Sequence, residues 1–165
     1  MSRLKIQVFL ADRQNRVRIS KPKFIRWVRK ILETLHWEQI ALSVALVNDS
    51  EMRRLNRRFL GEDRPTDVLA FEAGNTKLFP KPRIPLLGEV VVSVDAAQRL
   101  APGWGHSWKE ELLLYLCHGI LHLMGYGDST KRLKAQMDKI QDKVLQKILE
   151  KSRRKWPSKK PKPLF

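Results

Sequence analysis

Hydrophobic and polar positions along the chain follow two periods, and four short segments show the pattern of β-strands. Residues 4–10 alternate loosely between apolar and polar side chains, as a half-buried strand does. Residues 42–47 form an almost wholly apolar run, which is typical of a strand buried on both faces. The other predicted strands cover residues 67–71 and 87–94. Residues 74–85 contain three prolines, so we expect a loop between these last two strands.

Apolar residues spaced three and four apart predict helices between these strands. A first helix begins after Ser20, a common N-cap residue, and has Pro22 in its first turn. Asn48 can cap a second, short helix that runs to residue 57 or 58. Its spacing predicts that three side chains face inward: Met52, Leu55 and Phe59.

Three further helices are predicted in the second half of the chain. Residues 95–100 form a short one, which we expect residues 102–105 to end because they contain Pro102. Ser107 and Glu110 have capping-box spacing, which predicts a helix from 107 to 124. The last helix is predicted from 129 to about 153, with one apolar face made of Leu133, Met137, Ile140, Val144, Leu145 and Ile148.

Helices interleaved with about four strands predict an α+β (mixed α/β) fold in which a small mixed sheet packs against helices. A chain of 165 residues with 42% hydrophobic residues suits one domain with a real core, which we place at residues 1–150. Residues 151–165 differ, with seven Lys or Arg, three prolines and no acidic residue. We expect this basic tail to be flexible, because it has too little apolar surface to bury.

The segment from His118 to Asp128 carries candidate metal chemistry. Its spacing is H-x-x-x-H-x-x-G-x-x-D, and residues four apart on a helix lie on the same face. His118 and His122 can therefore direct both imidazoles at one ion. Gly125 can turn the chain at the helix end and bring Asp128 back as a third ligand. Three protein ligands plus water describe a catalytic zinc site, whereas a structural site uses four protein ligands.

Two histidines four apart also occur by chance, and the alternative is a pair of buried imidazoles without a metal. The surrounding helix is largely apolar, so each ring needs a polar partner, and one ion satisfies both. Zinc peptidases share part of the spacing, but they need a glutamate directly after the first histidine as general base. Gly119 occupies that position and argues against a peptidase. Cys117 is expected to be a buried thiol, and His36 and His106 to be surface or loop histidines.

Three blocks of sequence resemble the YbeY family of metal-dependent endoribonucleases that act in ribosomal RNA maturation. The family signature H-G-x-L-H-L-x-G-Y-D-H matches this chain at each fixed position from His118 to Tyr126. Residues 63–71, DRPTDVLAF, are similar to the family's D-x-P-T-D-V-L-S-F segment, and residues 87–93, LGEVVVS, to its L-G-D-I-x-I-S strand. The resemblance covers roughly residues 4 to 150. It implies a small sheet with a neighbouring helix that carries the metal in a cleft.

The chain departs from the family pattern at two places. Asp128 stands where the family has its third histidine ligand, and Gly127 replaces the preceding aspartate. A carboxylate oxygen is a competent zinc ligand, so the site can survive with a changed metal preference. Leu60 stands where the family carries an arginine before a glycine. Three arginines lie nearby in sequence and are the candidate RNA-binding residues: Arg57, Arg58 and Arg64.

The net charge of +16, with a pI of about 10.4, indicates a polyanionic partner such as RNA, because neutralising phosphates releases counterions. A basic surface that serves only solubility is the alternative. No run of eighteen apolar residues predicts a membrane span, and the N-terminal residues lack a signal-peptide core. A single cysteine makes no internal disulfide, so we expect a reducing, cytoplasmic setting.

The leading hypothesis is a zinc-dependent endoribonuclease that acts on single-stranded RNA in ribosomal RNA processing, with one Zn²⁺ per chain. Such an ion can lower the pKa of water to about 7, or polarise a phosphate for attack by a ribose 2′-hydroxyl, and both routes stay open. Glu89 and Asp67 are candidate acid–base groups or partners that orient an imidazole. The alternative is a non-catalytic factor that binds RNA or the ribosome through a structural or degenerate metal site.

Overall fold

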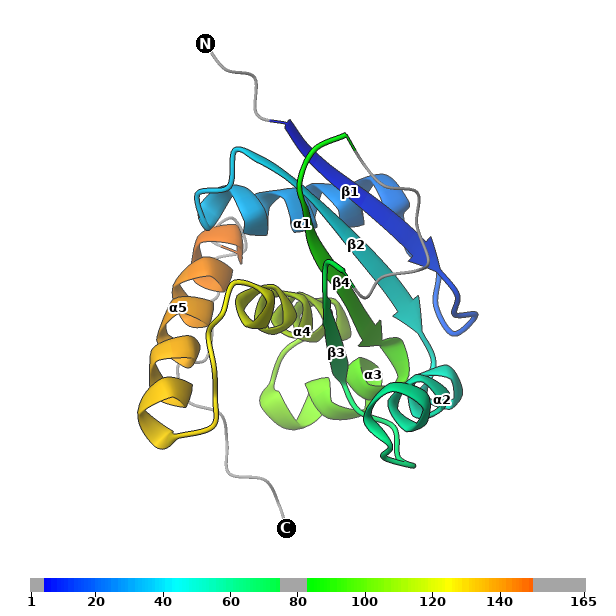
Figure 1. Cartoon of the computed structure of the whole chain (residues 1–165). Coiled ribbons are helices and arrows are strands. Elements are labelled where there is room, and N and C mark those ends of the chain that lie inside the picture. Colours follow the sequence, from blue (N-terminus) through cyan, green and yellow to red (C-terminus); the bar gives the residue numbers. More distant parts are fainter. Residues whose placement is uncertain (1–4, 75–82, 150–165) are drawn as a thin grey trace.

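The protein forms one four-stranded mixed sheet with helices on both faces, in a computed structural model that describes residues 5–74 and 83–149 (Figure 1). The strand order is β1-β2-β4-β3. Strand β1 pairs in parallel with β2 and β2 with β4, whereas β3 runs antiparallel to β4 at the edge. The four strands are Lys5–Asp12 (β1), Gln39–Val47 (β2), Val68–Glu72 (β3) and Leu86–Ser93 (β4). The α+β fold expected from the sequence is confirmed.

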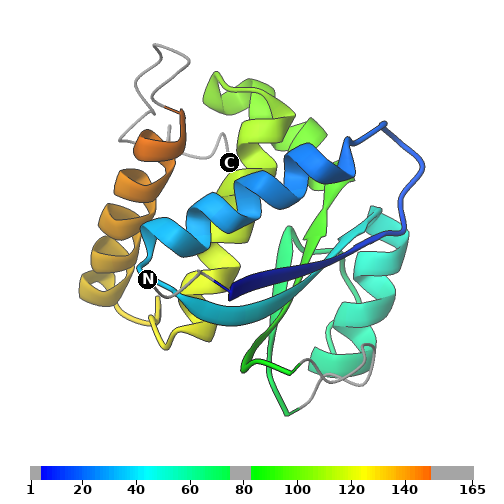
Figure 2. The same ribbon diagram turned by 90° about the horizontal axis from the view of Figure 1, so that it is seen from above.

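Five helices lie within the described residues: Lys21–Thr34 (α1), Asp49–Leu60 (α2), Val94–Trp104 (α3), Trp108–Leu123 (α4) and Lys131–Leu149 (α5). Helices α1, α4 and α5 gather on one face of the sheet, and α2 lies on the other (Figure 2). None of the helices in the described part of the chain is long and apolar enough to cross a membrane.

Strand alternation divides the core into two parts. Side chains of one parity in β2 and β4, among them Leu46 and Val90, face α1, α4 and α5 and belong to the larger core. Those of the other parity, among them Val47 and Val91, face α2 and form a smaller cluster with Met52. A residue's position in its strand therefore decides on which face its side chain acts.

Local sequence signals place most helix ends. Asn48 accepts a hydrogen bond from the Glu51 N–H at 2.9 Å and caps α2, as predicted. Ser107 and Glu110 form the predicted capping box at the start of α4. Ser20 occupies the N-cap position of α1, but its hydroxyl makes no capping hydrogen bond.

Three local expectations are wrong. Helix α3 does not end near residue 100 but continues through Pro102 to Trp104. Pro102 lacks only its own N–H as a hydrogen-bond donor, and the buried Ala101 before it holds this last turn against the core. Phe59 does not face inward. Half of its surface is exposed, because the last turn of α2 lies beside a cavity instead of over packed side chains. Leu133 is 38% exposed, because it lies in the first turn of α5.

Other predictions fall outside the described residues. The basic tail at residues 151–165 and the end predicted for the last helix near residue 153 lie beyond the described part of the chain. Most of the proline-containing loop predicted at 74–85 does as well. Within its described part, α5 begins at Lys131, two residues later than predicted, and the Thr130 hydroxyl accepts a hydrogen bond from the Leu133 N–H at 3.1 Å.

Candidate metal centre

Helix α4 and the turn that follows it hold the candidate metal ligands. The helix is buried along most of its length, and its last residues are followed by a Schellman turn. In this turn the Gly125 N–H donates to the His122 carbonyl and the Tyr126 N–H donates to the Leu121 carbonyl, both at 3.0 Å. Gly125 has φ +96°, a backbone conformation that residues with a side chain rarely adopt, which explains a glycine at this position. The turn sends the chain back toward the helix and brings Asp128 beside the histidines.

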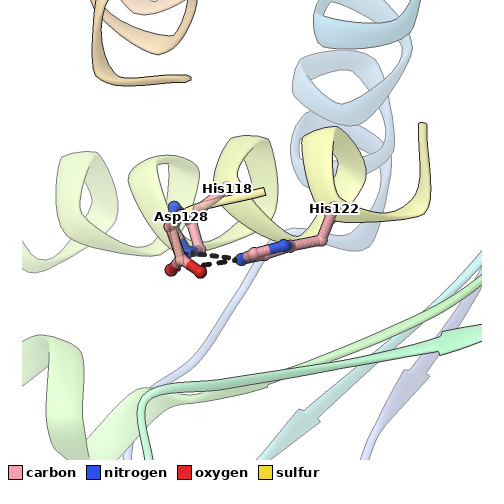
Figure 3. A group of neighbouring side chains, drawn as sticks. All are labelled: His118, His122 and Asp128. Atoms are coloured by element: carbon pink, nitrogen blue, oxygen red, sulfur yellow. Dashed lines mark hydrogen bonds and ion pairs between the residues drawn. The ribbon is translucent and has the colours of Figure 1, made fainter. Parts of the chain in front are cut away.

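The three predicted ligands converge (Figure 3). The Nε2 atoms of His118 and His122 lie 3.0 Å apart, and Asp128 Oδ2 lies 3.9 Å from the first and 3.6 Å from the second. A tetrahedral ion with bonds of about 2.0–2.2 Å holds its ligand atoms about 3.3 Å apart. The observed separations bracket that value, so two imidazoles and one carboxylate suit a zinc ion without rearrangement of the backbone.

Exposure and charge around the ligands favour a metal with an open position. The side chains of His118 and His122 are 28% and 32% exposed, and that of Asp128 is 49% exposed. Solvent can therefore reach the side of the site that the protein leaves uncovered. Burial, and then the neighbouring His122, lower the pKa of His118, while the charges of Asp67 and Asp128 act in the opposite direction. A lowered pKa keeps the His118 imidazole neutral, which is the form that binds a metal.

Gly119 faces the sheet and not the ligands. A Cβ built at this position would lie 2.6 Å from Val90 Cγ1 and 3.2 Å from Val68 Cγ2. The absence of a side chain allows α4 to lie close against β3 and β4. A glutamate base after the first histidine, as zinc peptidases have, would collide with the sheet here, which agrees with the sequence argument against a peptidase.

The two candidate acid–base residues differ in whether their charge acts on the histidines. Asp67 directly precedes β3, and its charge acts on His118. Its Oδ1 atom accepts hydrogen bonds from the Val68 N–H at 2.9 Å and the Thr66 hydroxyl at 3.3 Å. Glu89 has the opposite parity to Val90 in β4 and faces α2, so the structure does not bring it to the histidines. Of the two candidates, Asp67 is therefore the one whose charge acts on His118.

Gln141 in α5 is a neighbour of the ligands that sequence reasoning missed. Its side chain is 2% exposed and close enough to His118 to raise the pKa of that imidazole, against the larger effect of burial. Within the described ranges its Oε1 atom has no hydrogen-bond partner. A polar residue on the otherwise apolar face that contains Met137 and Val144 was the available signal. An imidazole ligand commonly has its second ring nitrogen fixed by such a partner.

The candidate RNA-binding arginines lie on and after α2. Arg57 and Arg58 are exposed in the last turn of this helix, and Arg64 in the following loop is paired with Glu62. The side chain of Arg64 is 74% exposed. Leu60, at the position where the resembling family has arginine, is 59% exposed, so a longer basic side chain fits there without disturbing the core.

Cys117 in α4 and His106 in the loop before it differ in how well the sequence predicted their surroundings. Cys117 is buried as expected, and burial raises the pKa of its thiol to about 12, so it is not a nucleophile. His106 lies in the loop before α4, one of the two settings expected for it, but it is not on the surface. Its side chain is 6% exposed, and its Nε2 contacts the buried carboxylate of Glu111 one helical turn into α4. This pair fixes the start of the helix and lies apart from the three metal ligands in sequence.

The chain is similar to known proteins in sequence and in fold. The sequence matches the family model described as Endoribonuclease YbeY over residues 9–149. It is 40% identical to the Endoribonuclease YbeY of Persephonella marina over 144 residues, which cover 86% of this chain and 90% of the relative. It is 36% identical to the protein of the same name from Aquifex aeolicus over 137 residues, which cover 80% and 87%. The solution structure of a Thermotoga maritima protein superposes with a TM-score of 0.60 at 26% identity, over 97% of this chain and 99% of that one.

Proposed function

The chain belongs to the endoribonuclease YbeY family, and from that premise we propose that it is a zinc-dependent endoribonuclease acting on single-stranded RNA in ribosomal RNA processing. The observation that supports this most is the convergence of two imidazole nitrogens and one carboxylate oxygen within 4.8 Å of one another. Three such ligands with one open position are typical of catalytic zinc sites. His118, His122 and Asp128 are the proposed ligands of one zinc ion per chain.

The protein's own residues position the reactants. When bound, zinc supplies a Lewis acid that polarises a phosphodiester oxygen and lowers the pKa of water. Gln141 is the proposed neighbour that orients the His118 ring, and Asp67, whose charge acts on His118, is proposed to orient a ligand or accept a proton. Attack by a ribose 2′-hydroxyl leaves a 2′,3′-cyclic phosphate, whereas attack by water does not. The chemistry of the product ends therefore distinguishes the two routes.

The proposed substrate is ribosomal RNA, free or in a ribosomal subunit, in the cytoplasm. The net charge of +16 favours a polyanion, and phosphate contacts dominate the affinity of proteins for nucleic acids. Arg57, Arg58 and Arg64 are the proposed phosphate contacts in the folded domain. They are exposed and close to the loop that leads from α2 to Asp67.

A non-catalytic RNA-binding or ribosome-binding factor is the second candidate. Two departures favour it: Leu60 replaces the arginine of the family motif, and Asp128 replaces its third histidine. A weaker ligand and a missing cation would each reduce stabilisation of charge on the phosphate in the transition state.

Metal analysis followed by RNA cleavage tests the proposal. Protein purified without chelator should contain about one zinc per chain and should cleave single-stranded RNA, and chelator should abolish cleavage. Wild type is compared with a double variant, Leu60→Arg with Asp128→His, which restores both family residues at exposed positions. Zinc-loaded wild type that leaves RNA intact, beside a double variant that cleaves it, would establish the non-catalytic alternative. Metal-free protein with undiminished cleavage would exclude the zinc mechanism.

The basic tail offers a separate test of the RNA partner. Removing residues 151–165 deletes seven positive charges and leaves the candidate metal centre intact. Affinity for single-stranded RNA should fall and its salt dependence should flatten, by about 0.7 in log–log slope for each phosphate that the truncated protein no longer neutralises. Binding titrations at several salt concentrations measure this. An unchanged slope would assign RNA binding to the folded domain, with Arg57, Arg58 and Arg64 the next residues to replace.

A further inference from the structure

A cavity lies on the face of the sheet opposite the metal ligands. It has a volume of about 210 Å³ and lies between α2 and strands β2, β3 and β4. Its wall is apolar and comes from small or branched side chains, including Ala45, Val47 and Val91. A mostly apolar cavity with a few converging polar groups is the usual form of a ligand site.

Two buried polar side chains face this side of the sheet without satisfied hydrogen bonds. Glu89 lines the cavity and is 4% exposed, and within the described ranges no hydrogen bond or ion pair reaches its carboxylate. Ser43 is directly opposite Glu89 in the register between β2 and β4 and is fully buried. Its hydroxyl also has no partner in the part of the chain that the structure describes. Buried polar groups in proteins normally have hydrogen-bond partners, so an unpaired carboxylate and hydroxyl at this place indicate a site for a polar ligand or water.

Aromatic rings and guanidinium groups form the rim of the cavity. The Phe59 and Phe71 rings are 5.1 Å apart between centroids and tilted, and half of Phe59 is exposed. The Arg58 guanidinium lies 5.3 Å from the centre of the Phe59 ring. Arg13 and Arg54 also line the cavity. The exposed Phe59 ring beside cations matches a flat heteroaromatic ring joined to a phosphate, since bases stack on aromatic side chains and cations bind the phosphate.

We propose that this cavity takes one base of a single-stranded RNA, with guanine preferred over the other three bases. Guanine presents two adjacent donors, N1–H and the 2-amino group, and a carboxylate offers two acceptor oxygens. Adenine and cytosine present one amino donor beside an acceptor, and uracil presents a single N–H donor. Glu89 therefore selects the base edge, Phe59 contacts its face, and Arg13 and Arg58 bind the phosphate.

This inference rests on the proposed function in one respect, that the ligand belongs to RNA. It does not depend on the metal ligands, because the sheet separates the cavity from them. The site would hold a guanine of the substrate while a different nucleotide lies at the metal. Strand β3 is the edge strand, so an RNA chain can pass from one face to the other around it. The cavity would then contribute sequence preference and not chemistry.

The test measures binding of 5′-GMP, AMP, CMP and UMP to the full-length protein by calorimetry or chemical-shift perturbation. GMP should bind about tenfold more tightly than the others, since only the guanine edge can donate to both carboxylate oxygens of Glu89. The Glu89→Gln variant should lose most of this preference. Glu33→Gln removes the same charge from the exposed surface of α1 on the opposite face and should keep it. An oligo(U) with one central guanine should bind more tightly than oligo(U) alone, and Glu89→Gln should remove the difference.

A second variant separates base contact from misfolding. Phe59 is half exposed, so Phe59→Leu should fold normally, and it should weaken GMP binding about tenfold by removing the stacked ring. Equal affinity for the four nucleotides, or a guanine preference that survives Glu89→Gln, would overturn the inference. So would GMP binding without a preference for the guanine-containing oligomer, which would indicate a free-nucleotide site. RNA cleavage that fails while GMP still binds selectively would reject only the proposed function.

Discussion

The two faces of the sheet are built from the same strands but differ in how completely they are packed. On the face toward α1, α4 and α5, the β2 and β4 side chains Val44, Leu46, Val90 and Val92 are fully buried. On the face toward α2, the alternate positions include Glu89 and border a cavity of about 210 Å³.

This difference shows two ways of making a polar site beside a core. The first site lies at the end of a buried helix, where a turn brings three ligands together without opening the core. The second lies between the sheet and the single helix α2, where incomplete cover leaves a buried carboxylate without a hydrogen bond or ion pair in the described residues.

The largest effect is expected at the metal ligands. His118→Ala or His122→Ala should reduce zinc affinity by roughly a hundredfold or more, because each removes a nitrogen from a three-ligand site. Elemental analysis and chelator competition measure the loss. The control is His36→Asn, which changes a histidine with φ +67°, a conformation that asparagine tolerates. Full zinc content in both ligand variants would show that the ion binds elsewhere.

The close packing of the α4 face predicts the next largest effect. Gly119→Ala places a methyl group 2.6 Å from Val90 Cγ1, and the stiff valine cannot easily move away. We expect a loss of about 1–3 kcal/mol in the free energy of unfolding, measured by urea titration. Gly103→Ala is the matched control, since that helical glycine in α3 has no atom within 4 Å of the new Cβ. It should be neutral or stabilise by up to about 1 kcal/mol. Equal effects of the two substitutions would contradict close packing.

A smaller effect on zinc affinity is expected from the buried partner of His118. Gln141→Leu keeps the volume but removes the buried polar group that acts on His118, and it should weaken zinc binding about tenfold, the lower end of what such neighbours contribute. Gln141→Glu keeps an acceptor and should bind zinc at least as well as Gln141→Leu. Chelator competition ranks the three proteins. Wild-type affinity in Gln141→Leu would make Gln141 a packing residue only.

The smallest effect is expected on the α2 face. Burial raises the pKa of Glu89, although the positive charge of Arg13 opposes this, and Arg54 and Arg58 also border the cavity. At pH values between the pKa of Glu89 in the unfolded state and its raised pKa in the folded state, this carboxyl is protonated only in the folded state. The free energy of unfolding therefore falls as pH rises through this range. Glu89→Gln removes this loss and should raise the melting temperature at pH 7, by roughly 2–4 °C for each kcal/mol relieved. The gain should vanish below about pH 4, where both states of wild type are protonated. A gain that is the same at all pH values would have another cause.

The sequence predicted much of the candidate metal centre because the geometry of that site is local. The spacing of His118 and His122 on a helix, the Schellman turn at Gly125 and the return to Asp128 all lie within eleven consecutive residues. The capping box at Ser107 likewise depends on neighbours in sequence. Helix periodicity and glycine's access to positive φ are properties of the chain itself, so no distant contact was needed to place these residues.

Only the tertiary structure decided which of the remaining polar residues lie near the ligands. Asp67 and Glu89 were equivalent candidates in the sequence, but the parity of β4 directs Glu89 toward α2, while the charge of Asp67, just before β3, acts on His118. Gln141 is near enough to act on His118 because α5 packs against α4. The exposure of Phe59 depends on where α2 stops covering the sheet. Each outcome depends on the relative placement of elements far apart in sequence, which is set by the burial of their combined apolar surfaces and not by local periodicity.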